Sequence, residues 1–550
     1  MILAGSAEPW SPQFGGHTRI VLPMLAAAVG FLLLIACANV ANLLLARARE
    51  RQREISIRKA LGASAGRLTR QVLTETAILT LSGGIAGCAL AYASLRLMNV
   101  VSISEINVSA VSIDLRVLLF TSAVCGMACL LCGIAPAWMF RNSNMHDALK
   151  QSGRQFGQSR TSRRFARSLI VIEIASCVVV LIGSGLLLRS FIQIIKVPLG
   201  FDPAQTLLVR TTLNRQRYSP DRRHTVERTI AARLASLPGV AAVALTTHVP
   251  LADERQIGFV IDGRPPDEFH WADNALVSGD YFRVMKIPLL RGRTFSDANT
   301  ATSPLVAVVN ETMARQYWPN EDPVGKGFHW GGRHLTVIGV VGDIHIEALD
   351  KPIAPTIYNS IYQIESGATS SGVFLLRART GQDPTRLAAS AQSVIRSADR
   401  GLPILGFSTL QQVVSSSLAI RRISLQLVGS FALIALLLSL IGIYGVLSYA
   451  VARRTQEMGV RLALGAKPIE IKALLLREGI QLAALGVAFG VVIGAFAVQY
   501  ISKLLFGVPT LDPVSFGGGV LLLFAVALLA SYVPARRASR VDPMTALRYE

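Results

Sequence analysis

The amino-acid sequence predicts a polytopic α-helical membrane protein with seven transmembrane helices and one extracytoplasmic α/β domain. The first observation is composition: of 550 residues, 51% are hydrophobic and 16% are charged, whereas a soluble domain usually has about 25% charged residues. The second is that apolar residues gather into runs long enough to cross about 30 Å of hydrocarbon. The third is a central stretch, residues 191–422, of ordinary soluble composition. A soluble globular enzyme, a disordered chain and a fibrous protein are therefore excluded.

Seven apolar runs are candidate spans. Six contain no Asp, Glu, Lys or Arg, and they run between Arg19 and Arg47, Glu75 and Arg96, Arg116 and Arg141, Arg422 and Arg453, Glu478 and Lys503, and Asp512 and Arg536. The seventh, between Arg167 and Arg189, is interrupted only by Glu173. Small residues within the runs, such as Gly83 and Gly87, allow helices to pack closely.

The central stretch alternates β-branched runs with amphipathic stretches, which predicts a compact α/β domain. The predicted strands are Thr206–Leu213, Val240–Thr246, Pro304–Asn310, Thr336–Val341 and Val373–Arg377, and the predicted helices are Asp221–Leu237 and Pro384–Ala398. Because Ser408–Arg422 contains no helix breaker, we expect one rigid helix to run from this domain into the fifth span.

The positive charge lies in four short segments next to the spans. Residues 46–70, 139–167, 453–477 and 536–550 together hold 25 basic and 7 acidic residues, which gives +18 of the +21 of the whole chain. Residues 191–424 have a net charge of only +5. Short loops rich in Lys and Arg stay in the cytoplasm, so we expect a multi-pass protein of the bacterial inner membrane with a cytoplasmic C-terminus. A nucleic-acid-binding protein is not favoured, because it would need these residues clustered in a folded domain.

Seven spans place the two ends of the chain on opposite sides of the membrane. The N-terminus would then lie outside, although Met1–Thr18 is polar and carries no export signal. We therefore expect that a preceding span is missing, and a fragment without function is one alternative.

An internal repeat relates the first three spans to the last three. The stretch Arg53–Ala63 (REISIRKALGA) matches Gln456–Ala466 (QEMGVRLALGA) at an offset of 403 residues. The same offset maps Glu75 onto Glu478, Gly83 onto Gly486 and Gly87 onto Gly490. After the last span of each half, Pro136-Ala137 precedes Ala148-Leu149-Lys150 and Pro534-Ala535 precedes Ala546-Leu547-Arg548 at equal spacing. The chain therefore contains two copies of one membrane unit.

The repeated element predicts a short amphipathic helix at the cytoplasmic interface. Glu and Arg stand four residues apart in both copies, an arrangement that supports a helix, and a glycine then ends it. Ile55 and Leu61, with their counterparts Met458 and Leu464, supply an apolar side. One interpretation is an anchor whose arginines meet anionic lipid. Two copies at equivalent positions favour docking sites for a two-fold symmetric partner instead.

These motifs resemble those of the FtsX/MacB-like permeases of ABC transporters. The resemblance rests on Arg53–Ala63, on Glu457–Ala466 and on the closing segment Pro534–Arg548. Within the central stretch it rests on Val277–Arg293, Tyr317–Lys326 and Val337–Asp343, which are similar to the periplasmic core domain of that family. The two-copy arrangement resembles the duplicated permeases found especially in Acidobacteria. In the first copy Trp138, Met139 and Phe140 replace the basic run of the closing motif.

The resemblance implies a division of the chain into six parts. These are an extracytoplasmic remnant at 1–19, a first FtsX-like permease domain at 20–150, a cytoplasmic linker at 151–167, a leading transmembrane helix at 168–190, a periplasmic α/β core domain at 191–422 and a second FtsX-like permease domain at 423–550. The first copy then lacks its leading span and its periplasmic domain.

The resemblance also implies a mechanism. A separate cytoplasmic ABC ATPase dimer would bind the interfacial helices, and ATP-driven closure would move the spans and the outer domain, which exports substrate by force transmission. The residues expected to couple the ATPase are Glu54, Arg58, Gly62, Glu457, Arg461 and Gly465. Membrane lipid and possible periplasmic adaptor or substrate molecules are the other expected partners. Mg-ATP would be held by the ATPase, so this chain is expected to be no enzyme and to hold no cofactor or metal.

Other candidate sites favour structural interpretations. Gly325-Lys326 resembles the end of a P-loop, but Asn320 and Gly327 replace the glycine and the Ser/Thr that the motif requires. All six cysteines fall within the spans, and Cys129-x-x-Cys132 is interpreted as a pair of small packing residues. Glu173 within a span is a candidate for a proton relay or, in the favoured interpretation, for a structural or interfacial role.

Two further functions compete with export. One is an FtsX-like regulator whose outer domain activates a periplasmic cell-wall hydrolase without transport. The other is a secondary transporter, which would need paired charges or broken helices within the membrane, and only Glu173 is available.

Overall fold

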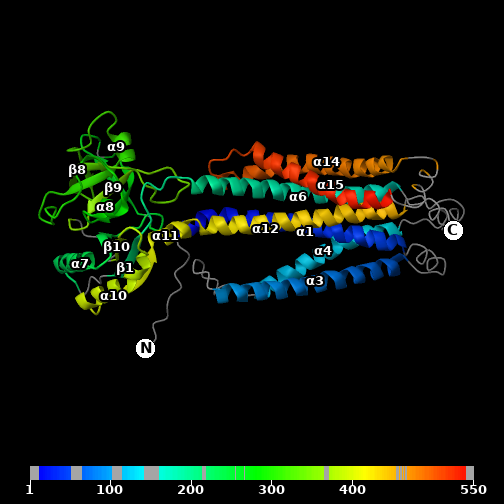
Figure 1. Ribbon diagram of the computed structural model, residues 1–550, viewed down its shortest axis with the longest axis horizontal. Coiled ribbons are helices and arrows are strands. Elements are labelled where there is room, and N and C mark those ends of the chain that lie inside the picture. The colour runs from blue at the N-terminus through cyan, green and yellow to red at the C-terminus, as the bar shows by residue number, and fades with distance from the viewer. Residues whose placement is uncertain are drawn as a thin grey trace. The chain divides into compact units, whose positions relative to one another are not determined.

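The protein forms two compact units, one within Met1–Gln193 and Arg421–Glu550 and the other at Ile194–Ile420. A computed structural model describes residues 12–50, 65–101, 114–141, 160–212, 218–253, 255–265, 267–363, 371–453, 458, 461, 464 and 467–539. We call the first unit the bundle and the second the central domain (Figure 1).

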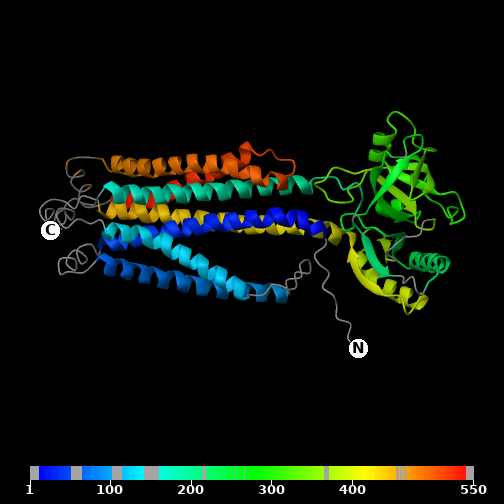
Figure 2. The same ribbon diagram turned by 180° about the vertical axis from the view of Figure 1, so that it is seen from behind.

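The bundle consists of long apolar helices. Among the described residues, seven helices are long and apolar enough to cross a membrane. They are α1 (Pro12–Glu50), α3 (Ala65–Val101), α4 (Leu115–Arg141), α6 (Arg160–Ile195), α12 (Ala419–Arg453), α14 (Pro468–Ile501) and α15 (Pro513–Ala538). Each contains one predicted span, and the predicted fold class is confirmed. Figures 1 and 2 show α3 and α14 at opposite edges of the bundle, with α1, α12 and α6 between them.

An aspartate caps the N-terminus of the last helix of each half. Asp512 accepts a hydrogen bond from the backbone N–H of Ser515 at 2.8 Å, and Pro513 follows it at the first helical position. Asp114 accepts one from the N–H of Val117 at 3.0 Å. An aspartate at this position satisfies a backbone donor that has no partner within the helix, so α4 and α15 begin in the same way.

A row of glycines on α14 lets α6 approach closely. A Cβ atom at Gly486 would lie 2.5 Å from Cγ2 of Ile174, and one at Gly490 would lie 2.6 Å from Cβ of Val178. Small residues are what permit such contact between transmembrane helices. Ile174 and Val178 are fully buried in the core that joins α6 to the other helices.

The central domain contains an 11-stranded mixed sheet flanked by helices. Its strands are β1 (Thr206–Thr212), β2 (Val240–Thr246), β3 (Gln256–Ile261), β4 (His270–Val277), β5 (Leu289–Gly292), β6 (Val306–Asn310), β7 (Gly327–Trp330), β8 (Arg333–Val341), β9 (Thr356–Ser360), β10 (Ser371–Ala378) and β11 (Ile404–Thr409). Its helices are α7 (Pro220–Ala235), α8 (Tyr281–Met285), α9 (Glu311–Tyr317), the 3-10 turn η2 (Pro384–Arg386), α10 (Leu387–Ala398) and α11 (Leu410–Ser417).

The sheet has an open part and a part that closes on itself. The strand order is β11-β1-β10-β2-β4-β3-β7-β8-β6-β9, with β5 beside β8. Because β9 also pairs with β4, in parallel, the strands from β4 to β9 form a closed circuit. Their inward side chains include the fully buried Phe259, Phe328 and Val337, which belong to the core of the domain.

Every predicted strand and helix of the central domain is present, but the predicted continuous helix is not. Thr409 and Gln412 form a reciprocal capping box that begins α11 only after β11 has ended. At Leu418 the backbone N–H bonds the carbonyl of Ser415, three residues back, and α12 starts at Ala419. The hydroxyl of Ser417 bonds the carbonyl of Val414, and such local bonds compete with regular helix. The segment expected to be one rigid helix is therefore two.

We predict that Gly490→Ile destabilises the bundle by about 1–3 kcal/mol, because the new side chain must displace Val178. The matched control is Gly87→Ile, at the equivalent position of the first half. A Cβ there meets no described heavy atom within 4 Å, and we expect little change. Thermal unfolding in detergent micelles measures both, and equal losses in the two variants would contradict the assignment.

Glu227 gives the central domain a pH-dependent stability. It is buried on α7, and burial raises its pKa from 4.5 to about 7, against a smaller opposing effect of Arg223. A carboxyl whose pKa is raised by folding stabilises the domain fully below pH 4.5 and loses that contribution as pH rises through about 7.

We therefore expect Glu227→Gln to gain stability relative to the parent protein between pH 4.5 and 7, on the order of 3 kcal/mol in total. His248, whose pKa burial lowers to about 4, is present in both proteins and cancels in the difference. Urea unfolding of residues 194–420 at several pH values measures it. A difference that stays constant with pH would show that the carboxyl ionises as it does in water.

Candidate functional site

Two ion pairs hold α6 to the second half of the bundle, one near each end of the helix. Arg167 pairs with Glu478 of α14, and Arg189 pairs with Asp512 at the start of α15. Asp512 is buried, with 3% of its side chain exposed, and it also receives the hydroxyl of Ser515 at 2.7 Å. α6 precedes the central domain in the chain, so the span that leads into that domain is fixed to α14 and α15.

A buried polar contact joins the two halves of the bundle. Glu173 of α6 is fully buried and accepts a hydrogen bond from the side-chain amide of Asn39 on α1 at 3.0 Å. The same amide donates to the carbonyl of Leu438 on α12 at 3.1 Å. Glu173 therefore lies in the helix interface instead of extending toward the membrane surface, and the structural interpretation fits its position.

A glycine makes room for this carboxylate. A Cβ atom at Gly442 of α12 would lie 2.5 Å from both carboxylate oxygens of Glu173 and 2.4 Å from the amide oxygen of Asn39. The repeat offset of 403 residues maps Asn39 onto Gly442. Equivalent positions of the two halves therefore meet at this contact.

One described residue of the second copy of the repeated element, Met458, lies at the bundle end where α12 and α15 end and α14 begins. Met458 is buried there in an apolar cluster with Val451, Ile471, Leu475, Ala535 and Ala538. Arg461 is helical and exposed. Leu464, which was expected to share the apolar side with Met458, lies in a turn with 82% of its surface exposed. That expectation is wrong, because Leu464 lies in a turn and is not part of the buried cluster around Met458.

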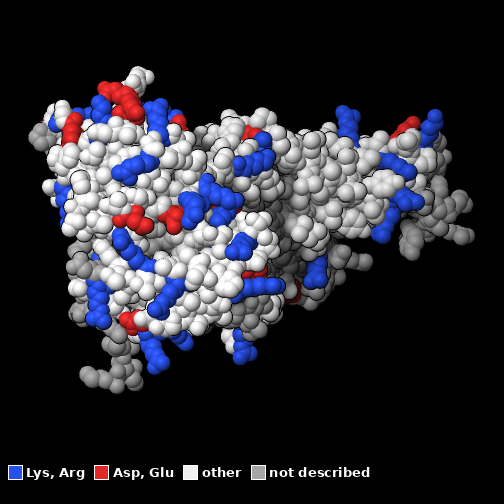
Figure 3. Space-filling view, turned by 60° about the vertical axis from the view of Figure 1, so that its left-hand side comes forward, with Lys and Arg blue, Asp and Glu red and all other residues white. Residues whose placement is uncertain are grey.

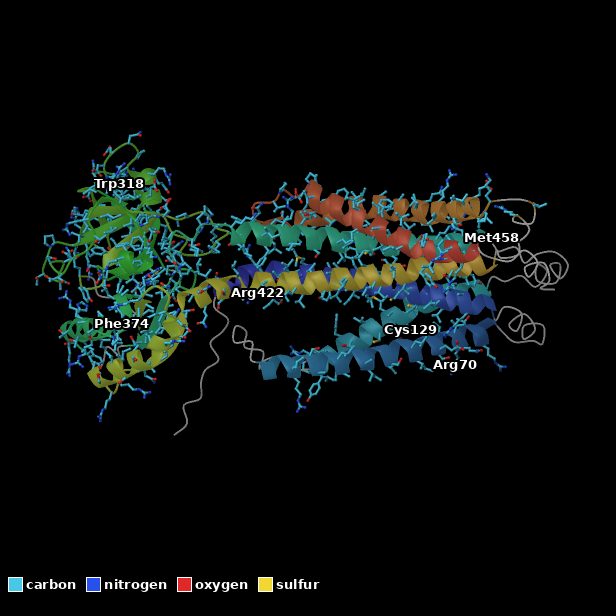
Figure 4. All side chains as sticks on the ribbon, in the orientation of Figure 1. Arg70, Cys129, Trp318, Phe374, Arg422 and Met458 are labelled. Carbon is cyan, nitrogen blue, oxygen red and sulfur yellow. The ribbon has the colours of Figure 1, made fainter. Side chains whose placement is uncertain are left out.

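The other predicted coupling residues, Glu54, Arg58, Gly62, Glu457 and Gly465, lie outside the described residues. Their roles stay predictions. Figure 4 places Met458 beyond the end of α12, at the same end of the bundle as Arg70 near the start of α3. Figure 3 shows a bundle surface largely free of charge along its length, with Lys and Arg gathered at its far end.

Two regions of the chain, residues 26–145 and 429–543, match the FtsX-like permease C-terminal family, and residues 168–394 match the MacB-like periplasmic core domain. The chain belongs to the FtsX/MacB-like permeases of ABC transporters. The two FtsX-like matches begin 403 residues apart, the offset of the internal repeat. This permease is accordingly a multi-pass membrane protein with a MacB-like domain between its two FtsX-like regions.

Curated relatives of the permease are distant. It is 25% identical over 286 residues to the macrolide export ATP-binding/permease protein MacB of Mannheimia succiniciproducens, over 50% of this chain and 43% of that protein. It is 24% identical over 281 residues to the uncharacterized ABC transporter permease YknZ of Bacillus subtilis, over 50% of this chain and 69% of that protein. The permease thus spans less than half the length of the MacB relatives that it matches. The crystal structure of the periplasmic region of MacB from Actinobacillus actinomycetemcomitans is 17% identical, with a TM-score of 0.29, over 41% of this chain and 97% of that one.

The P-loop-like and cysteine motifs of the permease lie in a turn and in an apolar cluster, respectively. Asn320 and Gly325 adopt positive φ angles of 64° and 89° in the turn between α9 and β7. Cys132 packs against Cys37 and Ala128 in a small apolar cluster between α1 and α4. The described residues contain no group of His, Cys, Asp and Glu that could hold a metal ion.

Sequence reasoning missed the ion pairs of α6. Glu478 was singled out as a member of the repeat and as the end of a span, while Arg189 and Asp512 served only to mark the ends of spans. The available signal was the position of opposite charges at the ends of different apolar runs, but no spacing rule relates residues that are more than 300 positions apart.

We predict that Arg189→Ala destabilises the bundle by about 1–2 kcal/mol, because it removes the counterion of the Asp512 carboxylate, while the 37% exposure of the Arg189 side chain lets water screen the pair. Asp512→Asn keeps a capping side chain and removes the charge. Combined with Arg189→Ala, it should recover most of the loss. A double-mutant cycle of unfolding in detergent measures the coupling; additive losses would mean that the two side chains do not interact.

Proposed function

We propose that this permease couples ATP hydrolysis by a separate cytoplasmic ABC ATPase to movement of its periplasmic domain, and thereby drives export by force transmission. The family assignment supports an ATPase partner, since the MacB relatives carry an ATP-binding part in their own names. The observation that carries the proposal is the position of Met458, which anchors the start of the coupling helix in a cluster of α12, α14 and α15.

This anchor offers a path for force. A load on the helix that contains Arg461 acts through Met458 on Val451 of α12, Ile471 of α14 and Ala535 of α15. α14 and α15 are tied to α6 by the Arg167–Glu478 and Arg189–Asp512 pairs. α6 and α12 are the spans that precede and follow the periplasmic domain in the chain. Both spans that flank that domain, α6 and α12, are therefore connected to the helix that contains Arg461.

The exposed positive charge of the helix that contains Arg461 suits an ATPase surface. Arg461 is exposed beside the buried Met458, so the helix can present its basic face while its apolar face stays on the bundle. Arg58 occupies the equivalent position of the first copy. Two equivalent basic helices match a dimeric partner with two equivalent clefts.

We expect Arg461→Glu and Arg58→Glu each to lower ATP hydrolysis by the reconstituted complex by about tenfold or more, because a cation at the interface is replaced by an anion. The assay uses the full chain in proteoliposomes with a separately purified cytoplasmic ABC ATPase. Association of the two proteins is measured on the same samples. Arg70→Glu is the matched control, since it makes the same charge change at an exposed position of the same bundle end.

Unchanged association and hydrolysis in both coupling variants would refute the docking proposal. To test force transmission, hydrogen exchange is compared with and without ATP. ATP should alter exchange in residues 410–420, which connect the domain to α12. Hydrolysis without any such change would refute force transmission while leaving docking intact. A chain that activates a cell-wall hydrolase in these vesicles without exporting substrate would act as a regulator.

A further inference from the structure

A row of small residues on α3 is open. Gly83, Gly87 and Ala91 follow one another at four-residue intervals, so they lie on one face of the helix, and all three are exposed. Among the described residues, no heavy atom lies within 4 Å of a Cβ placed at Gly83 or Gly87. The neighbouring Gly84 faces α4 instead, where a Cβ would lie 2.6 Å from the sulfur of Cys125.

The equivalent row of the second half is covered by α6. The offset of 403 maps the three residues onto Gly486, Gly490 and Gly494 of α14, and all three are buried. They lie against Ile174, Val178 and Ile182, which recur every four residues on α6. The second half of the bundle thus shows that such a row packs against a helix face with β-branched side chains every four residues.

One other neighbour of α3 and α14 corresponds between the two halves. Gly479 of α14 faces Ser531 of α15, since a Cβ at Gly479 would lie 2.4 Å from the serine Oγ. In the first half the small and hydroxyl residues are exchanged: Gly133 of α4 faces Thr76 of α3, with 3.7 Å between a Cβ there and the threonine Oγ1. α4 therefore packs on α3 as α15 packs on α14. Among the described residues, no helix packs on the Gly83–Gly87 row of α3 as α6 packs on α14.

The second feature of the first half is Asp114, which corresponds to Asp512 of the second half. The closing motifs are related by an offset of 398 residues, from Pro136 to Pro534, which maps Asp114 onto Asp512. Asp512 binds Arg189 of α6. Asp114 keeps the capping role at 3.0 Å from the N–H of Val117, but it is exposed. Of the described cations, none forms an ion pair with Asp114 within 4.0 Å.

We propose that the row Gly83–Gly87–Ala91 is the docking face for a transmembrane helix of a partner subunit. That helix carries β-branched side chains every four residues to fill the row. It also carries an arginine or lysine eleven residues beyond the one that contacts Gly87, as Arg189 follows Val178 on α6. The glycine row sets the closeness of packing, and Asp114 sets the register and direction of the helix.

The test uses a synthetic peptide of residues 160–195, the α6 sequence, as the probe. The full chain with its six cysteines replaced by alanine carries a donor dye on Arg70→Cys and is reconstituted in vesicles of phosphatidylcholine and phosphatidylglycerol. The peptide carries an acceptor dye at its N-terminal end. We expect energy transfer that saturates with peptide density and is competed by unlabelled peptide.

Variants of the chain assign the contact. Gly83→Ile with Gly87→Ile should weaken binding at least tenfold, while the control Ala89→Ile, an exposed residue on the opposite side of α3, should leave it unchanged. Asp114→Arg should abolish binding of the parent peptide and restore it for a peptide carrying Arg189→Asp. This charge exchange decides the question even if the double isoleucine variant fails to fold.

Three results would overturn the proposal. Energy transfer that rises linearly with peptide density, without saturation, would show that lipid covers the row. Binding that is equal in the glycine variants and the parent would place the contact elsewhere. Saturable transfer between donor- and acceptor-labelled copies of the chain itself, lost in the glycine variants, would show that the row is occupied by a second copy.

Discussion

The bundle depends on the close approach of α6 to α14, which only glycine permits at Gly486 and Gly490. Transmembrane helices gain little by burying apolar surface from lipid, so packing and polar contacts must hold them together. A Cβ at either position would overlap a β-branched side chain of α6. With that approach in place, Arg167 and Arg189 lie close enough to pair with Glu478 and Asp512. The glycine row thus allows the ion pairs to form, and the ion pairs in turn hold α6 against α14 and α15.

Duplication has kept the geometry of contacts while exchanging the residues that make them. The glycine and hydroxyl pair at Gly479–Ser531 reappears in the first half as Thr76–Gly133 with the roles reversed, since helix separation depends on the sum of the two side chains. Asp114 and Asp512 both cap their helices. The cap is present in both copies, whereas the described residues show an arginine partner for Asp512 alone, so the cap does not depend on the ion pair.

The spans and the repeat could be predicted because they are properties of local composition. The central domain was predicted only in part. β4 was not predicted, because it contains Asp273 and Asn274, which interrupt the expected apolar pattern. Their burial is understandable only in the fold, where Asn274 accepts a hydrogen bond from Asn359 of β9 at 2.7 Å. β7, with four residues, is too short for any periodicity. At the candidate site, the role of Arg461 stays a prediction from its motif, whereas the packing of Met458 follows from three helix ends that are distant in sequence.

Glu173 links the two spans that flank the periplasmic domain. α12 can lie against the carboxylate only because position 442 is a glycine, and Asn39 of the other half bonds both the carboxylate and the α12 backbone. Sliding α6 along α12 would break these bonds while Glu173 stays fully buried, and a buried polar group without a hydrogen-bond partner is costly. The two spans are therefore constrained to move together at this level. The third participant, Asn39, belongs to the first copy, and Ile35 of the same helix packs in the core with α6 and α12, so the first copy contacts both spans that flank the periplasmic domain.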